Sequence, residues 1–311
     1  MCPITSMERT IHLTPDYRLP TASVNTTACH AIIALLMSNH SEPSLSLLSE
    51  AAVAAARAGG AVLLEEFANA RQIEYKGKID LVTDADRRSE KTVVSVLQSH
   101  FPSHQILAEE GSRGGESPRY RWIIDPLDGT TNYAHRYPHF AVSIGLELDG
   151  EMAVGVVFDP VLGELFTAHA GGGAFINDRP IRVSGTNDLL HSLLCTGFPY
   201  DHSFIGSSLR RWDEFVRTAQ AVRRDGSAAL DICYVAAGRF DAFWEDHLFP
   251  WDMAAAMLIV REAGGMATDF RGSPPSVYRG ELVASNGLLH PAMLAGISAA
   301  GGVSRTASSA E

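Results

Sequence analysis

The chain has 311 residues and a formal net charge of −11, from 25 lysines and arginines against 36 acidic residues. Neutralising phosphates requires a basic face that these totals do not supply, so the balance argues against a nucleic-acid binder. With 46% apolar and 20% charged residues, the composition excludes disorder as the main state. A chain of about 300 residues is also long enough to divide into two halves.

The cysteines are sparse and far apart, which argues against a disulfide scaffold and favours a reducing cytoplasm. They are Cys2, Cys29, Cys195 and Cys233. Cys195 and Cys233 lie in apolar surroundings and are predicted to be buried packing residues. No run approaches the ~18 uninterrupted apolar residues of a membrane span. The apolar stretch 31–37 lacks the basic flank and cleavage site of a signal peptide, so no membrane partner is expected.

Residues 1–44 show neither a helical nor a strand period and are predicted to be a flexible extension. An upstream start codon, with the folded protein opening near Met37, would explain this stretch, and an ordinary tail would explain it equally well. A helix is then predicted over residues 45–67, interrupted only by Gly59-Gly60. A second, amphipathic helix is predicted over residues 85–99 and ends before Pro102.

Strand-like segments follow, and the Asp149-Gly150 pair predicts a hairpin between two of them. The predicted strands are residues 121–124, 140–148, 152–158 and 164–168. This pattern predicts an antiparallel sheet with the two helices packed against it.

The second half alternates between strand-like and helical segments, which predicts a mixed or parallel sheet. The predicted strands are 193–196, 240–244 and 281–284, and the predicted helices are 208–221, 228–237, 252–263 and a last one after Pro291. The predicted division is therefore an extension (1–44), an N-terminal α+β half (45–192), a C-terminal α/β half (193–298) and a disordered tail (299–311).

The most informative segment runs from Trp122 to Asn132 and contains Asp125-Pro126-Leu127-Asp128-Gly129-Thr130-Thr131. Pro126 cannot continue a strand ladder and Gly129 permits an abrupt turn, so two acids should sit where a strand ends. Backbone N–H groups opening a helix would lie beside them. Acids next to an anion site make sense if Asp125 and Asp128 hold a hard divalent cation. The alternative is an ordinary turn with capping residues.

Three other segments favour the cation site. Glu109-Glu110 follows an apolar stretch, at a strand end where ligands collect in α/β folds. Asp252 opens a helix, where an aspartate alone would usually be a cap. Thr83 and Asp86 precede the second helix and would also be capping residues in isolation. Each segment alone is a weak signal, but together they indicate a cation site.

These segments together resemble the inositol monophosphatase family over roughly residues 45–295. The resemblance is carried by Asp80-Leu81-Val82-Thr83 with Asp86, Glu109-Glu110, Asp125-Pro126-Leu127-Asp128-Gly129-Thr130-Thr131-Asn132, Gly226-Ser227-Ala228-Ala229 and Trp251-Asp252-Met253-Ala254-Ala255. It implies a layered α/β/α/β/α sandwich and a homodimer. Where the family usually has Ala-Ala-Gly, this chain has Ala254-Ala255-Ala256, a change expected to affect helix packing more than metal binding.

The resemblance also implies a set of Mg²⁺ ligands. Glu109, Asp125 and the backbone carbonyl of Leu127 correspond to ligands of the first ion, with a weaker third ion near Glu109. Asp125, Asp128 and Asp252 correspond to ligands of the second. Two such cations can activate a water and stabilise the leaving oxygen of a phosphate ester. Because Mg²⁺ prefers oxygen, His135 and His139 are expected to be surface or supporting residues.

The remaining roles are also implied by the resemblance. Thr130 would orient the attacking water with support from Thr83 and Asp86. The backbone N–H groups of Gly129 and Thr130 would hold the phosphate, reinforced by the helix dipole, with Asp128 beside them. The residues expected on the substrate side are Arg223, Ala228 and Glu245.

The predicted function is Mg²⁺-dependent hydrolysis of myo-inositol monophosphate, with lithium sensitivity. Histidinol phosphate, fructose 1,6-bisphosphate and 3′-phosphoadenosine 5′-phosphate are alternative substrates. Asn132-Tyr133 after Gly-Thr-Thr favours the inositol type over the nucleotide type. The alternative of another class is a non-catalytic, metal-binding regulatory protein. Such a protein should have lost at least one metal ligand or the water-orienting threonine, and all of them are present here.

Overall fold

The computed structural model describes residues 42–67, 73–75 and 81–301. The predicted extension 1–44 and tail 299–311 fall almost entirely outside these ranges. Both therefore remain predictions, as does the division at residues 192 and 193.

The helices and the minor elements are as follows. The α-helices are α2 (Leu45–Phe67), α3 (Asp84–His100), α4 (Thr130–Ala134), α5 (Ile205–Thr218), α6 (Ala228–Ala236), α7 (Pro250–Glu262) and α8 (His290–Ala299). Two 3-10 helices are η1 (Leu189–His191) and η2 (His202–Phe204). A separate antiparallel pair is formed by β1 (Ile73–Tyr75) and β2 (Leu81–Thr83).

Two sheets contain the other strands. The eight-stranded sheet has the order β10-β9-β8-β7-β6-β5-β3-β4. Its strands are β3 (His104–Ala108), β4 (Arg113–Gly114), β5 (Ser117–Asp128), β6 (Ala141–Leu148), β7 (Glu151–Asp159), β8 (Glu164–His169), β9 (Ala174–Ile176) and β10 (Arg179–Pro180). The five-stranded sheet has the order β12-β11-β13-β15-β14. Its strands are β11 (Leu193–Thr196), β12 (Ala221–Arg223), β13 (Ala242–Asp246), β14 (Met266–Thr268) and β15 (Glu281–Ser285).

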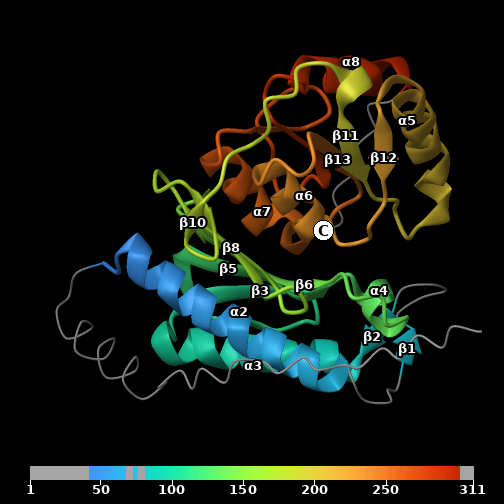
Figure 1. Ribbon diagram of the computed structural model, residues 1–311. Coiled ribbons are helices and arrows are strands. Elements are labelled where there is room, and N and C mark those ends of the chain that lie inside the picture. Colours follow the sequence, from blue (N-terminus) through green and yellow to red (C-terminus); the bar gives the residue numbers. More distant parts are fainter. Residues whose placement is uncertain (1–41, 68–72, 76–80, 302–311) are drawn as a thin grey trace, which may run out of the picture. The chain divides into compact units, whose positions relative to one another are not determined.

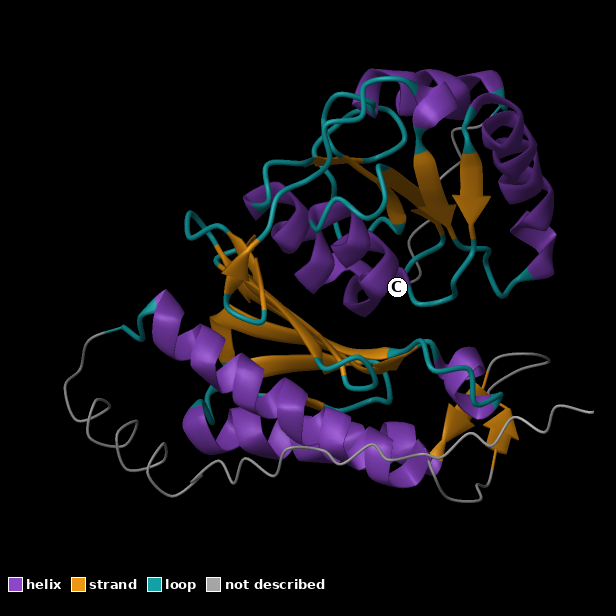
Figure 2. Ribbon diagram, viewed as in Figure 1, coloured by secondary structure: helices purple, strands orange, loops and turns teal. Residues whose placement is uncertain are grey.

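These elements form alternating helix and sheet layers (Figure 1). Helices α2 and α3 pack against one face of the eight-stranded sheet, while α6 and α7 lie between the two sheets. Helices α5 and α8 cover the other face of the five-stranded sheet, as the colouring by secondary structure shows (Figure 2). Apolar side chains fill each boundary between layers. The predicted α/β/α/β/α sandwich is confirmed.

Strand directions also agree with the sequence patterns. The large sheet is antiparallel except that β3 and β5 run parallel. In the small sheet, β11 is parallel to β12 and β13, whereas β15 is antiparallel to its neighbours. The hairpin between β6 and β7 turns at Asp149 and Gly150, which both have positive φ, at 52° and 87°. Such a turn matches the right-handed twist of the strands that it joins.

Several boundaries differ from the sequence prediction. Strand β5 does not end before Pro126 but continues to Asp128, because a bulge accommodates the residue that cannot donate a hydrogen bond. The helix predicted over 208–221 spans 205–218 instead, and Ala221–Arg223 form the edge strand β12. The three residues of β12 are a strand because they pair with β11. No local sequence pattern reveals this pairing.

Among the described residues, α2 alone is long and apolar enough by composition to cross a membrane. Its packing accounts for that composition. Leu48, Ala52, Ala55 and Leu63 are fully buried, and the helix lies against α3 and strands β6, β7 and β8. Gly59, in the predicted interruption, lets α3 approach, since a Cβ there would lie 2.7 Å from Val93 Cγ2.

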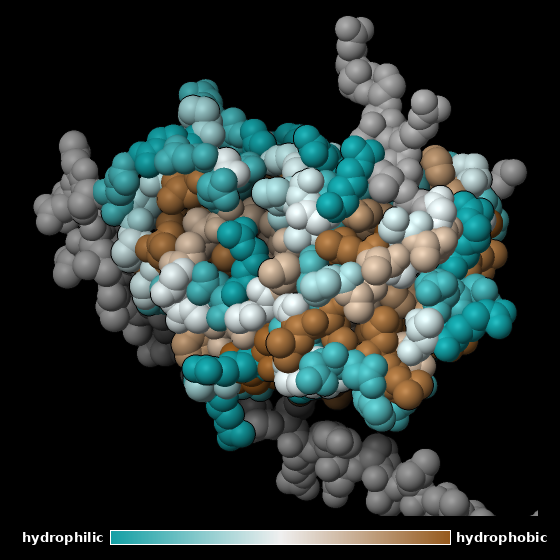
Figure 3. All heavy atoms as spheres, turned by 90° about the horizontal axis from the view of Figure 1, so that it is seen from above, coloured by the Kyte–Doolittle hydropathy of each residue, from teal (hydrophilic) through white to brown (hydrophobic). Residues whose placement is uncertain are grey.

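The α5 and α8 side of the molecule carries small groups of apolar side chains scattered among polar ones (Figure 3). Exposed apolar residues in this region of the sequence include Leu209 and Val216 of α5 and Leu288 before α8. Single apolar residues of this kind are normal on a protein surface.

Helix α7 packs closely on the large sheet because small residues face one another. Ala254, Ala255 and Ala256 are fully buried, so the departure from Ala-Ala-Gly is accommodated within the core. A Cβ at Gly155 of β7 would lie 2.4 Å from the backbone oxygen of Ala255. Backbone atoms cannot swing away as a flexible side chain can.

We therefore expect Gly155→Ala to destabilise the protein by about 1–3 kcal/mol through overpacking. Urea unfolding followed by circular dichroism measures this loss. Gly185→Ala is the control, because a Cβ at Gly185 meets nothing within 4 Å. Equal stability of the two variants would contradict the close approach of α7 to β7.

Candidate active site

Most of the residues singled out from the sequence line one cavity of about 110 Å³. The predicted residues that line it are Glu109, Asp125, Leu127, Asp128, Gly129, Thr130, Ala228, Glu245 and Asp252. They come from the ends of β3, β5 and β13 and from the first turns of α4, α6 and α7. Segments separated by more than a hundred residues in sequence therefore meet in one place.

Glu109 and Asp125 meet because β3 and β5 are parallel neighbours. Ala108 pairs with Ile124, so the residue after each strand position emerges at the same edge of the sheet. The backbone N–H of Glu109 donates to the carbonyl of Ile124 at 3.2 Å, which continues the ladder by one residue. Antiparallel strands would have placed these acids at opposite edges.

The bulge in β5 brings Asp125 and Asp128 to the same cavity. Between Asp125, which pairs with Ser143, and Asp128, which pairs with Ala141, β5 contains one more residue than β6. Asp125 Oδ1 accepts a hydrogen bond from the backbone N–H of Leu127 at 2.9 Å, which holds the bulge closed. Pro126, expected to end the strand, instead marks the point where its direction changes.

Asp252 reaches the cavity from the first turn of α7. Its Oδ2 accepts a hydrogen bond from the backbone N–H of Phe249 at 2.7 Å, and Pro250 occupies the first position of the helix. One carboxylate oxygen of Asp252 therefore does cap the start of the helix. The same residue also lines the cavity beside the other acids.

Burial raises the pKa of three of these acids, and neighbouring acids add to the shift in two of them. Burial, followed by the charges of Glu109, Asp128 and Asp252, raises the pKa of Asp125 well above its usual value. Burial, followed by the charge of Asp128, does the same for Asp252. Burial also raises the pKa of Asp128, although hydrogen bonds from Ser227 and Ala229 oppose the shift.

A hard divalent cation fits this set of donors. Carboxylate oxygens and a backbone carbonyl are the ligands that Mg²⁺ and Ca²⁺ prefer. Carboxylates brought together in this way must either hold protons or bind a cation. The carbonyl of Leu127 accepts a hydrogen bond from Thr130 at 3.0 Å and keeps a second lone pair for a ligand.

Thr130 and Asp86 come together as the sequence predicted. Thr130 Oγ1 lies 3.3 Å from Asp86 Oδ1 and 3.0 Å from the carbonyl of Leu127, so its one proton is shared between two acceptors. Asp86 is fully buried in the first turn of α3. Thr83 ends β2, and its side chain lies outside the described part of the structure.

Helix α3 braces the site through residues that the sequence interpretation missed. Ser89 Oγ donates to the carbonyl of Pro126 at 2.8 Å and so supports the bulge. The Glu90 carboxylate accepts the backbone N–H groups of Glu110 at 2.7 Å and Ser112 at 2.9 Å, which fixes the turn that carries Glu109. Their spacing of three and four residues from Asp86, on one helix face, was the available signal.

Gly129 has a conformation and a position that require glycine. Its φ of 93° is left-handed, and a Cβ would lie 3.0 Å from the carbonyl oxygen of His139. It caps α4, which has only five residues, so any reinforcement of phosphate binding by the helix dipole comes from little more than one turn.

Of the residues expected on the substrate side, Glu245 and Ala228 line the cavity and Arg223 is not among its lining residues. Arg223 is exposed, and its guanidinium donates to the carbonyl of Val222 at 3.2 Å, whereas Arg224 lines the cavity. Successive residues near a strand end point in opposite directions, so a shift of one position changes which arginine faces inward. Gly197 makes room for Glu245, since a Cβ there would lie 2.2 Å from Glu245 Oε2.

Comparison with known proteins identifies the family. Residues 44–301 match the inositol monophosphatase family. The chain belongs to this family. Phosphatase is the class of activity that the family name denotes.

Three relatives illustrate the similarity to members of the family. An inositol-1-monophosphatase of Mesorhizobium japonicum is 42% identical over 80% of this chain and 95% of its own length. A Pseudomonas aeruginosa protein named Nus factor SuhB is 44% identical over 78% of this chain and 93% of its own length. The solved inositol monophosphatase of Anabaena is 42% identical, with a TM-score of 0.76 over 82% of this chain and 96% of that structure.

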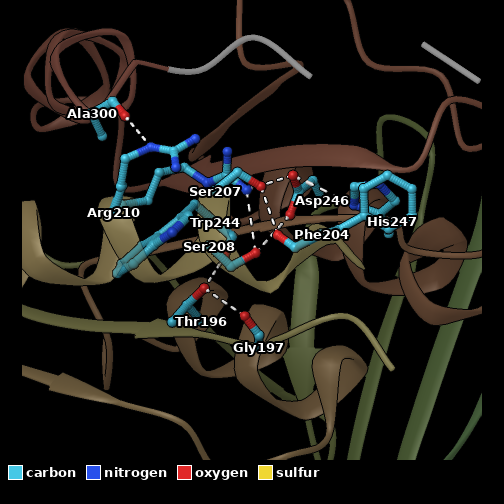
Figure 4. A network of polar contacts seen from close by, with 11 residues as sticks. Thr196, Gly197, Phe204, Ser207, Ser208, Arg210, Trp244, Asp246, His247 and Ala300 are labelled. Carbon is cyan, nitrogen blue, oxygen red and sulfur yellow. Dashed lines mark hydrogen bonds and ion pairs between the residues drawn. The ribbon is translucent and has the colours of Figure 1, made fainter. Parts of the chain in front are cut away.

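A polar network holds the end of β13 in this member of the inositol monophosphatase family (Figure 4). Asp246, next to Glu245, forms a buried ion pair of 2.5 Å with Arg211 of α5 and accepts a hydrogen bond from Ser208 at 3.3 Å. His247 follows with a φ of 66°, and its ring stacks on Phe204 at 3.9 Å between centroids. The network fixes the strand end from which Glu245 faces the cavity.

The raised pKa values predict how stability depends on pH in chelator. Because Asp125 and Asp252 bind protons more tightly in the folded state, their stabilising contribution is complete below about pH 4 and is lost as pH rises through their raised pKa. Asp125→Asn should therefore be more stable than the wild type at pH 8 in EDTA.

Mg²⁺ should reverse the order of stability, so that the wild type becomes more stable than Asp125→Asn. A bound ion stabilises the folded wild type by about 2.7 kcal/mol at a hundred times its Kd, whereas the variant should gain little. Thermal unfolding with EDTA or Mg²⁺ measures both effects. A variant that is less stable than the wild type in EDTA would contradict mutual repulsion at the site.

Proposed function

We propose that the protein is a Mg²⁺-dependent phosphomonoesterase that hydrolyses myo-inositol monophosphate to inositol and phosphate. The convergence of Glu109, Asp125, Asp128 and Asp252 beside Thr130 carries this proposal. The relatives named inositol-1-monophosphatase support the choice of substrate.

The proposed Mg²⁺ ligands follow the family pattern. Glu109, Asp125 and the carbonyl of Leu127 are assigned to the first ion, and Asp125, Asp128 and Asp252 to the second. When bound, two such ions supply Lewis-acid chemistry, activating water and stabilising charge on the leaving oxygen. Ser227 Oγ and the N–H of Ala229 donate to Asp128 Oδ2 at 2.5 and 2.8 Å, which orients its other oxygen.

The chain's own groups position the reacting molecules. The Thr130 hydroxyl, within reach of Asp86, is assigned to orient the attacking water, with Thr83 proposed as its support. The backbone N–H groups of Gly129 and Thr130 are assigned to the phosphate oxygens. Such fixed donors need no reorganisation as negative charge develops.

Glu245 is assigned to accept hydrogen bonds from substrate hydroxyls. Burial, followed by the charges of Asp252 and Asp231, raises the pKa of Glu245 well above its usual value. Hydroxyl groups that donate hydrogen bonds to the carboxylate would stabilise its charged form and oppose this shift. Ala228 lines the same cavity as Glu245. The arginine in the cavity wall is Arg224 rather than Arg223. We therefore assign to Arg224 the role on the substrate side that was expected of Arg223.

A second role is suggested by the relatives named Nus factor SuhB, which include the Pseudomonas protein at 44% identity. That name leaves open a regulatory role beside, or in place of, catalysis. The convergence of acids and of the Thr130–Asp86 pair favours catalysis in this chain. By resemblance we also infer a cytoplasmic, lithium-sensitive homodimer that binds neither nucleic acid nor membrane.

The first test removes one proposed ligand. Asp128→Asn keeps the side-chain shape but loses the charge, and it should lower Mg²⁺-dependent phosphate release by about 100-fold or more, since even outer partners of metal ligands account for 10–100-fold. Asp213→Asn, at an exposed ion pair with Arg217, is the control and should retain full activity. An inactive wild type, or an active Asp128→Asn, would overturn the proposed chemistry.

A second test addresses the substrate. We expect kcat/KM for myo-inositol 1-phosphate to exceed that for histidinol phosphate, fructose 1,6-bisphosphate and 3′-phosphoadenosine 5′-phosphate. Glu245→Gln should reduce this preference, because its amide supplies one acceptor instead of a carboxylate. A much faster rate with histidinol phosphate would replace inositol phosphate as the assigned substrate while leaving the chemistry intact.

A further inference from the structure

A second group of possible ligands includes none of the predicted Mg²⁺ ligands. His139 precedes β6, Asp225 lies in the turn between β12 and α6, and Asp231 is on α6. One ligand atom from each lies within 4.8 Å of the others. None of the three has a role in the proposed phosphatase chemistry.

The backbone of this cluster is fixed by hydrogen bonds. Asn132 Nδ2 donates to the carbonyl of His139 at 2.8 Å and to the carbonyl of Asp225 at 2.8 Å, which joins two of the three residues through one amide. The N–H of Asp231 donates to the carbonyl of Ser227 at 2.9 Å in the first turn of α6. The backbone of the three residues is thus fixed by hydrogen bonds that do not use their side-chain polar atoms, as a preorganised site requires.

Two buried polar atoms in the cluster have no hydrogen-bond partner within the described part of the chain. They are Asp231 Oδ1, on a residue that is 1% exposed, and His139 Nε2, on a residue that is 9% exposed. The two atoms face each other at 3.7 Å, which is too long for a hydrogen bond. Two donors that are each about 2.1 Å from one tetrahedral ion would lie about 3.4 Å apart, close to this separation.

We propose that His139, Asp225 and Asp231 bind a divalent transition-metal ion such as Zn²⁺, at a site separate from the Mg²⁺ ligands. An imidazole nitrogen selects first-row transition metals over Mg²⁺, which keeps to oxygen. Two carboxylates and a neutral imidazole balance the charge of a divalent ion. Asp225 is partly exposed, which gives the ion a path from solvent.

Cys195 supports the cluster from the core. Its thiol hydrogen-bonds to Asp231, and burial raises the pKa of the thiol well above its usual value. The sulfur is therefore a protonated donor that orients the carboxylate, as partners of metal-ligating carboxylates commonly do.

An ion at this site would join the start of β6 to the turn that leads into α6. That turn carries Ser227, which donates to Asp128 at 2.5 Å, and Asp231 lines the catalytic cavity. The site would thus stiffen one wall of the cavity.

The test is a zinc titration of chelator-treated protein in excess Mg²⁺, followed by calorimetry. The wild type should bind one more Zn²⁺ per chain than His139→Gln, or bind it at least about tenfold more tightly. Asp225→Asn, in a partly exposed turn, should show the same loss. His247→Gln is the matched control because it removes another imidazole that lines the cavity, and it should bind Zn²⁺ like the wild type. Circular dichroism checks that each variant is folded.

A spectroscopic readout separates this site from the acidic one. Cu²⁺ bound here should show nitrogen coupling in its electron paramagnetic resonance spectrum, lost in His139→Gln and retained in His247→Gln. Equal Zn²⁺ binding by the wild type and His139→Gln, or no binding by either, would leave His139 and Asp231 as a simple ion pair and overturn the proposal. Neither result depends on phosphatase activity.

Discussion

Repulsion between carboxylates is the constraint on which the rest of the site depends. Glu109, Asp125, Asp128 and Asp252 line one small cavity, and burial together with their mutual charges raises the pKa values of Asp125 and Asp252. Isolated side chains would move apart or take up protons. The fold prevents the acids from moving apart because the backbone that carries each one is held in place. A parallel strand pair, a bulge and the start of a helix hold it. Part of the net charge of −11 is therefore concentrated where a cation can neutralise it.

Helix α3 contributes both to the hydrophobic core and to the candidate active site. One face buries Val93 and Leu97 against the other layers of the N-terminal core. Its first two turns also direct polar groups at the site, where Asp86 lies near the Thr130 hydroxyl and Glu90 holds the turn beside Glu109. A displacement of this helix would therefore disturb catalysis as well as stability.

The layered fold and the lining acids could be predicted because their signals are local. A short motif contains Asp125 and Asp128 and has a glycine just after Asp128, where its strand ends, and helical periodicity defines residues 45–67. Features that depend on distant partners could not be predicted. Strand β5 passes Pro126 because Ser89, from another element, supports the bulge. Arg224 rather than Arg223 faces the cavity because β12, a strand that exists only by pairing, sets the alternation.

We propose that these acids form a site for divalent cations beside a phosphate position. Anomalous diffraction from crystals grown with Mn²⁺ and inorganic phosphate tests it most directly, because manganese can be located without assumptions about ligands. We expect two Mn²⁺ peaks about 3.5–4 Å apart that share Asp125, with phosphate next to Gly129 and Thr130. The absence of anomalous density among these carboxylates would contradict it.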